Sequence, residues 1–187
     1  MSKVFFGGSR KLPRLNSALR TRLRNLITNE HIVLIGDASG ADKAAQTFFA
    51  EEGYKNVVVY CMDGDCRNNI GNWEVKPIAS GEKKKDFKYF AIKDAEMSRE
   101  ADYGFMLWDG KSKGTLNNVL NLLQQNKMVL IYFSPSKSFV SVKTLHAIEQ
   151  LIAQCTPEAK NYFDKSIKFS ERTQLQQTKL NFANKVG

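Results

Sequence analysis

Residues 101–115 are the stretch that most constrains the fold, because a short apolar strand there opens directly into a glycine-containing turn and a helix. Residues 103–108 form the apolar run. Spacings of three and four residues follow, which predict a helix, at Leu116, Val119, Leu120 and Leu123. Such a turn points backbone N–H groups and the positive end of a helix dipole at one spot. We therefore expect an anion, and above all a phosphate, to bind here.

The same order of strand, glycine turn and helix occurs twice earlier in the chain. Residues 4–6 end in Gly7-Gly8-Ser9-Arg10, and residues 31–35 end in a turn over 36–42. Further strands are predicted over 57–61 and 127–133, and further helices from Pro13, through about residue 52, over 83–99 and over 142–153. Residues 62–82 show little periodicity and are predicted to be a long loop.

Short strands that are apolar throughout and alternate with helices are typical of a parallel sheet covered on both faces. Right-handed crossovers then predict an α/β, Rossmann-like three-layer fold whose mainly parallel sheet has five or more strands. We expect residues 1–155 to form this domain. Residues 156–187 are polar and lysine-rich and are predicted to be a helical C-terminal extension or tail, suited to homo-oligomer formation.

The charge balance favours an anionic partner. Lys and Arg number 28 against 19 Asp and Glu, which gives a net charge of +9. A phosphorylated small molecule and nucleic acid both fit this excess. No apolar run reaches the roughly 18 residues of a membrane span, and the N-terminus lacks the apolar stretch of a signal peptide. We therefore expect a cytoplasmic protein without a membrane partner.

The cysteines and histidines predict no metal site and no cofactor. Cys61, Cys66 and Cys155 make an odd count without a Cys-x-x-Cys pair, which favours free thiols over a disulfide or zinc. His31 and His146 lie far from other candidate ligands or bases.

The candidate ligand-binding residues lie mostly in the three glycine turns. They are Gly8, Ser9 and Arg10, then Gly36, Asp37, Gly40 and Asp42, and finally Asp109, Gly110, Ser112, Gly114, Thr115 and the following Asn118. A carboxylate of the second turn is suited to accept hydrogen bonds from ribose hydroxyls. The alternatives are structural: a tight turn that needs glycine, or Ser39 or Asp42 as a helix N-cap. The third turn lacks the residue order of a P-loop, which excludes an ATPase of that class.

Two further candidates come from the irregular segment 62–82. Trp73 is a candidate for stacking on a base, and Arg67 for holding a phosphate or carboxylate. The alternative for Trp73 is a side chain that anchors the loop on the core.

Taken together, these motifs resemble the SLOG superfamily, which includes the Lonely Guy (lysine-decarboxylase-like) phosphoribohydrolases and is related to the nucleoside 2-deoxyribosyltransferases. The matching residues are 6–10, 36–42, Lys93-Asp94 with Met97, Ala101-Asp102, 108–110 and Gly114-Thr115. The resemblance covers about residues 4–133. It implies that the glycine turns hold the phosphate and sugar of a nucleotide-derived ligand, with the phosphate at Gly110, Ser112, Gly114 and Thr115.

The chain departs from the superfamily where its enzymes carry a glutamate. After Gly114-Thr115 the sequence has Leu116-Asn117-Asn118, and an amide cannot serve as nucleophile or base. Asp109, Asp37 and Asp94 are the candidate catalytic substitutes.

Three hypotheses follow from these residues and from the net charge of +9. The first is a sensor or scavenger that binds a phosphorylated nucleotide derivative without hydrolysis. The second is an N-glycosidase or ribosyltransferase, and the third is a nucleic-acid-binding protein.

Overall fold

In the computed structural model, which describes residues 1–81 and 84–174, the strands form a seven-stranded sheet in the order β4-β3-β2-β1-β5-β6-β7. Neighbouring strands are parallel, except that β7 runs antiparallel to β6. The winding reverses between β1 and β5, which lie side by side. The strands are β1 (Lys3–Gly8), β2 (Ile32–Gly36), β3 (Val57–Met62), β4 (Glu74–Ile78), β5 (Tyr103–Trp108), β6 (Val129–Phe133) and β7 (Ser138–Val142).

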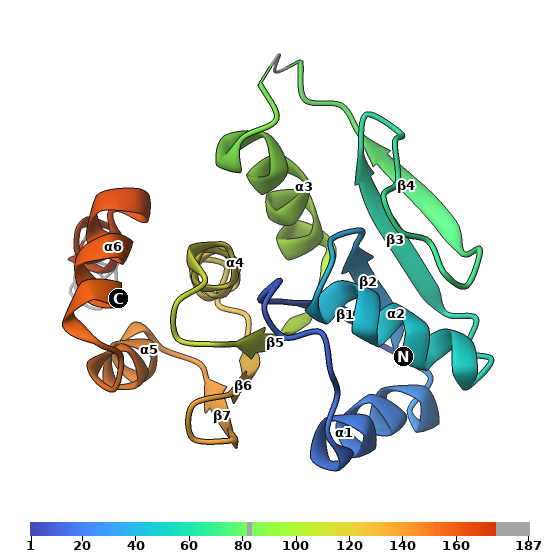
Figure 1. Cartoon of the computed structure of the whole chain (residues 1–187), viewed down its shortest axis with the longest axis horizontal. Coiled ribbons are helices and arrows are strands. Elements are labelled where there is room, and N and C mark those ends of the chain that lie inside the picture. Colours follow the sequence, from blue (N-terminus) through green and yellow to red (C-terminus); the bar gives the residue numbers. More distant parts are fainter. Residues whose placement is uncertain (82–83, 175–187) are drawn as a thin grey trace, which may run out of the picture.

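Helices cover both faces of the sheet and give the molecule three layers (Figure 1). One hydrophobic cluster lies under α1 and α2, and the other under α3, α4, α5 and α6. Val4 and Phe6 belong to the first cluster and Phe5 to the second, so β1 is buried on both faces. The predicted α/β, Rossmann-like three-layer fold is therefore confirmed. The helices are α1 (Ser17–Thr28), α2 (Ala41–Glu51), α3 (Phe87–Glu100), α4 (Lys113–Leu123), α5 (Leu145–Ala153) and α6 (Pro157–Ile167), and residues 169–174 are also helical.

The edge strands β4 and β7 were missed by the sequence prediction. β4 lies within the predicted loop 62–82, and β7 includes Val142, which was assigned to a helix that in fact begins at Leu145. β4 is exposed or half-exposed throughout and β7 is mostly half-exposed, so both lack the apolar run that marks a buried strand. Pro77 in β4 is tolerated because an edge strand leaves one row of N–H groups unpaired.

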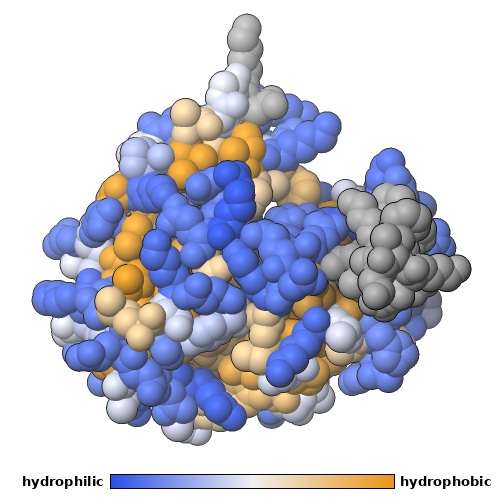
Figure 2. Space-filling model, turned by 180° about the vertical axis from the view of Figure 1, so that it is seen from behind, coloured by the Kyte–Doolittle hydropathy of each residue, from blue (hydrophilic) through white to orange (hydrophobic). Residues whose placement is uncertain are grey.

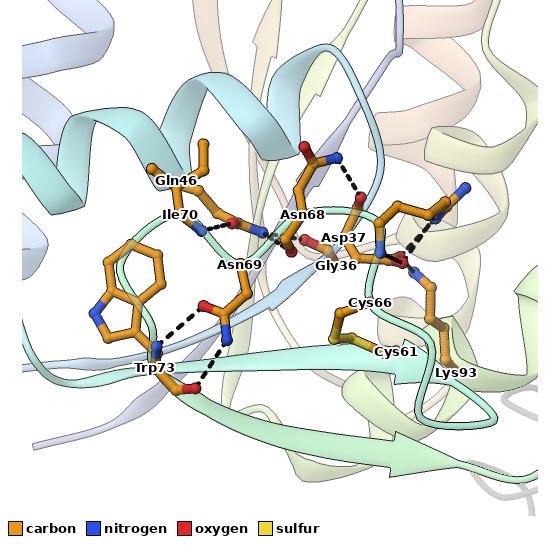
Figure 3. The surroundings of a disulfide bond; sticks show 11 residues. Gly36, Asp37, Gln46, Cys61, Cys66, Asn68, Asn69, Ile70, Trp73 and Lys93 are labelled. Atoms are coloured by element: carbon orange, nitrogen blue, oxygen red, sulfur yellow. Dashed lines mark hydrogen bonds and ion pairs between the residues drawn. A yellow bond between two sulfur atoms is a disulfide. The ribbon is translucent and has the colours of Figure 1, made fainter.

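The prediction of free thiols was wrong for Cys61 and Cys66, which form a disulfide with Cα atoms 5.1 Å apart (Figure 3). Cys61 lies near the end of β3. A turn at Asp63 and Gly64, both with positive φ, then reverses the chain and brings Cys66 back beside it. The cysteine spacing does not reveal this turn, so the proximity of the two thiols could not be predicted. Cys155 is a free thiol.

The C-terminal segment packs on the domain through α6. Thr156 caps this helix and Pro157 occupies its first turn, both favourable N-terminal features. Phe163 is fully buried, and its ring lies 5.8 Å from that of Trp108 in β5. Residues 175–187 of the predicted extension, and the predicted start of a helix at residue 83, lie outside the described residues.

Hydrophilic side chains cover most of the face seen in Figure 2, with hydrophobic patches between them. In the described part of the chain, no helix is both long enough and apolar enough to cross a bilayer.

Candidate functional site

A cavity of about 600 Å³ lies at the carboxyl ends of β1 and β5, where the winding of the sheet reverses. This is the place where ligands bind in open α/β sheets. Its described lining carries more positive than negative side chains. The basic residues are Arg10, Lys11, Arg67, Lys85, Lys93, Lys111 and Lys113, and the acidic residues are Asp42, Asp86, Asp94 and Asp109.

Ser9 joins the turns at this edge. Its backbone N–H donates to the Leu107 carbonyl of β5 at 2.9 Å, and its own carbonyl accepts from the Ala41 N–H at the start of α2 at 3.2 Å. Its hydroxyl donates to Asp109 Oδ2 at 2.7 Å. The turns after β1 and β5 and the start of α2 are thus held together by one buried residue, and Arg10 follows it into the cavity lining.

The turn after β5 presents the N-terminus of α4 to the cavity. Asp109 Oδ1 accepts the N–H groups of Lys111 and Ser112, at 3.0 and 2.7 Å, and the Ser112 hydroxyl caps the helix by accepting from Thr115 N at 3.3 Å. Among the described residues, the backbone N–H groups of Lys113 and Gly114 find no hydrogen-bond partner. Both residues line the cavity, so these two donors are suited to an anion.

A buried charge cluster forms one wall of the site. Lys93 of α3 is only 3% exposed, and its Nζ lies 3.2 Å from Asp94 Oδ1 and 3.7 Å from Asp37 Oδ1. A Cβ on Gly36 would lie 2.7 Å from Asp42 Oδ2 and 2.8 Å from Lys93 Nζ. Only glycine therefore leaves room for these two charged groups over the end of β2.

The segment that follows the disulfide packs beside Gly36 and Asp37 at the end of β2 (Figure 3). The Arg67 guanidinium pairs with both carboxylate oxygens of Asp37, through Nε to Oδ2 at 2.9 Å and Nη2 to Oδ1 at 2.5 Å. The Asn68 amide donates to the Asp37 carbonyl at 2.8 Å, and the Gln46 side-chain oxygen accepts from the Ile70 N–H at 3.1 Å. These bonds fix Arg67 at the cavity, with its side chain about one third exposed.

Burial and the charges within this cluster shift the pKa values of its members. Burial raises the pKa of Asp42 to about 7 despite the nearby Lys93 charge, and Asp94 adds to the rise. Burial acts to raise the pKa of Asp37 as well, but the hydrogen bonds of Arg67 and the charge of Lys93 hold it below its usual value. Burial would lower the pKa of Lys93, yet the charges of Asp94, Asp42 and Asp37 raise it. Two cations thus face three carboxyl groups, and protonation of Asp42 makes the cluster neutral.

No protein-family model and no curated protein matches the chain. A solved structure does: DNA processing protein A from Helicobacter pylori, described for its single-stranded DNA binding mode, has a TM-score of 0.55 and 16% identity. The match covers 89% of this chain and 80% of that one. It establishes the fold, which is Rossmann-like.

The cavity brings most of the predicted residues together. The predicted ligand-binding residues that line it are Gly8, Ser9, Arg10, Asp42, Arg67, Asp109, Ser112, Gly114, Thr115 and Asn118, and the candidate catalytic Asp94 lines it too. Gly36, Asp37 and Gly40 lie outside the lining and support it from the second turn, while Gly110 lines a neighbouring hollow beside Phe133 and Cys155. Neither Ser39 nor Asp42 caps α2, since Gly40 is its N-cap residue.

Trp73 lies away from the cavity, in its alternative role as a loop anchor. The side chain is buried, with the residue 7% exposed, and its indole N–H donates to the Tyr54 carbonyl at 2.8 Å. The Asn69 side chain also bonds both backbone polar groups of Trp73, at 2.9 and 3.0 Å. An indole held in this way has no free face for a base, so we leave Trp73 out of the proposed site.

Sequence analysis missed several residues of the lining. Lys93 was noted only for the superfamily resemblance, although a lysine on the inward face of a helical pattern is a signal of buried charge. Phe87 and Phe90 fit the inward face of the helix predicted over 83–99, but both are only partly buried in the cavity wall. Tyr162 comes from the C-terminal segment, and no local pattern could place it there.

Proposed function

We propose that the protein binds a phosphorylated, nucleotide-derived small molecule in this cavity, as a sensor or scavenger that does not hydrolyse it. The observation that carries the proposal is the pair of backbone N–H groups at Lys113 and Gly114, which have no partner among residues 1–81 and 84–174 and lie in a cavity with an excess of basic side chains. A phosphate at a helix N-terminus accepts such bonds and meets the positive end of the helix dipole. The volume of about 600 Å³ leaves space for a sugar and base beside the phosphate.

The carboxyl groups support binding better than catalysis. Asp109 accepts three hydrogen bonds that shape the turns. Asp37 lies outside the lining and is paired with Arg67. Asn117 accepts from Arg172 at 2.8 Å, so it is part of the contact between α4 and the C-terminal segment. For the alternative function of an N-glycosidase or ribosyltransferase, Asp94 is the candidate best placed, beside Lys93 in the cavity wall.

The first test replaces Arg10, which is exposed in the cavity lining. We expect Arg10→Gln to weaken the binding of AMP or GMP about tenfold or more, since a hydrogen bond to a charged group contributes about 1.5–3 kcal/mol. Isothermal titration calorimetry measures this, and Arg14→Gln is the matched control because Arg14 is exposed outside the cavity.

Mass spectrometry after heat denaturation should also detect a co-purified nucleotide. Repeatedly empty supernatants, together with no binding of either nucleotide, would exclude this function.

Binding of single-stranded nucleic acid is the second candidate, favoured by the net charge of +9 and by the DNA-binding description of the structural neighbour. Besides Arg67, which is paired with Asp37, four exposed basic residues line the cavity: Arg10, Lys11, Lys85 and Lys111. If they contact four phosphates, raising the salt from about 50 to 200 mM should weaken binding roughly 50-fold. Fluorescence anisotropy of a labelled oligonucleotide measures this, with Lys11→Gln and Lys111→Gln expected to reduce the salt slope. Absent or salt-insensitive binding would remove the candidate.

Two further predictions belong to this proposal: a cytoplasmic location, and self-association through the C-terminal segment.

A further inference from the structure

The cavity lining holds an arrangement of aromatic rings around one cation that phosphate binding does not explain. Lys113 Nζ lies 4.6 Å from the ring centroid of Phe87 in α3 and 5.5 Å from that of Tyr162 in α6. All three side chains line the cavity. Three segments that are distant in sequence therefore bring two rings and a lysine to one place.

The rings are available to a ligand to different degrees. Phe90 is already covered by two guanidinium groups, with Arg10 at 5.6 Å and Arg67 at 4.6 Å from its centroid. Tyr162 is 46% exposed, and Phe87 is half-buried. An aromatic ring left open in a cavity is a surface on which a flat, π-rich group can stack.

The C-terminal segment fixes Tyr162 in this position. The neighbouring Phe163 is fully buried against Trp108, so α6 is anchored on β5 and Tyr162, the residue before Phe163, lines the cavity. Lys113 begins α4, beside the unpaired N–H groups proposed for the phosphate. A ring and a phosphate of one molecule can thus be recognised at adjoining places.

We propose that Phe87, Lys113 and Tyr162 form a base-binding subsite, in which the nucleobase of a nucleoside 5′-phosphate stacks on Tyr162 or Phe87. This inference rests on the proposed function and names the part of the ligand that the phosphate site leaves open. Lys113 has donors only, so it bonds acceptor atoms on the base edge or the phosphate when the base takes its place between the rings. The C-terminal segment is then part of the binding site.

The test compares ligands with and without a base. We expect the wild-type protein to bind AMP or GMP about tenfold or more tightly than ribose 5-phosphate, as stacking on an aromatic ring provides. Tyr162→Ala should weaken nucleotide binding at least about fivefold and leave ribose 5-phosphate binding unchanged. Tyr162→Phe should retain the wild-type preference. Calorimetric titration gives the affinities, and the melting temperature of each variant checks its folding.

Phe87→Leu is the second variant, because it removes the other ring and keeps an apolar side chain. The subsite is overturned while the proposed function stands if both variants bind nucleotides like the wild type, or if they weaken nucleotides and ribose 5-phosphate equally. If the wild-type protein binds neither nucleotide nor ribose 5-phosphate, the proposed function fails and the subsite fails with it.

Discussion

Replacing Lys93 with methionine is expected to lower the free energy of unfolding by about 3–5 kcal/mol at pH 8. Lys93 is 3% exposed and is the cation next to three carboxyl groups, those of Asp37, Asp42 and Asp94. Methionine has a similar length and keeps the packing, but it leaves the buried Asp37 and Asp42 and the half-buried Asp94 with Arg67, which pairs with Asp37, as the remaining cation of the cluster. Urea denaturation of both proteins measures the loss.

The loss should shrink as the pH falls. Burial raises the pKa of Asp42 to about 7 in the folded protein, against 3.8 ordinarily, so the folded state holds a proton that the unfolded state has released. The contribution of Asp42 to stability is therefore full below about pH 4 and is lost as the pH rises through 7. Without the Lys93 charge the pKa of Asp42 is expected to rise further. Protonation at pH 5.5 then relieves much of the repulsion in the variant.

Lys88→Met is the matched control, since Lys88 is exposed on the same helix. It should change stability by no more than about 0.5 kcal/mol at either pH. A loss below 1 kcal/mol for Lys93→Met at pH 8, or a loss that grows toward pH 5.5, would contradict the account of the charge cluster.

The centre of the fold could be predicted from the sequence because its strands are buried on both faces. Residues 103–108 read as an apolar run and coincide with β5, and the predicted strand over 127–133 differs from β6 only at its start. The edges could not be predicted in this way. In β4, Glu74 and Lys76 alternate with apolar residues beside Pro77, a pattern that also fits a loop.

The parts of the candidate site also differ in how far the sequence predicts them. The glycine turns follow directly from buried strands, so their meeting at one edge could be inferred from topology, and Arg10 and Ser112 do line one cavity. The remaining wall depends on tertiary packing. Tyr162 reaches the cavity only because Phe163 docks α6 on Trp108, and Arg67 only because its segment is bonded to the end of β2. Neither contact leaves a local signal in the sequence.

Replacing Gly40 with alanine is expected to destabilise the protein by roughly 3 kcal/mol or more. Gly40 has φ +79° and ψ −126°, a conformation that L-residues avoid, and it precedes the first residue of α2. A Cβ there would also lie 2.3 Å from the Arg10 carbonyl oxygen and 2.4 Å from the Arg10 Cα. Backbone strain and a steric clash therefore add. Because the clash displaces Arg10, the variant should also bind AMP or GMP more weakly at a temperature where it remains folded.

Gly53→Ala separates the two effects. Gly53 also has a positive φ, of +66°, but a Cβ there would meet nothing within 4 Å. It should cost only the backbone strain, about 1–2 kcal/mol, and leave nucleotide binding unchanged. Chemical denaturation and calorimetric titration of both variants measure the difference. Equal losses of stability would mean that a Cβ at residue 40 does not clash with Arg10. The turn over residues 36–42 would then support α2 without positioning Arg10.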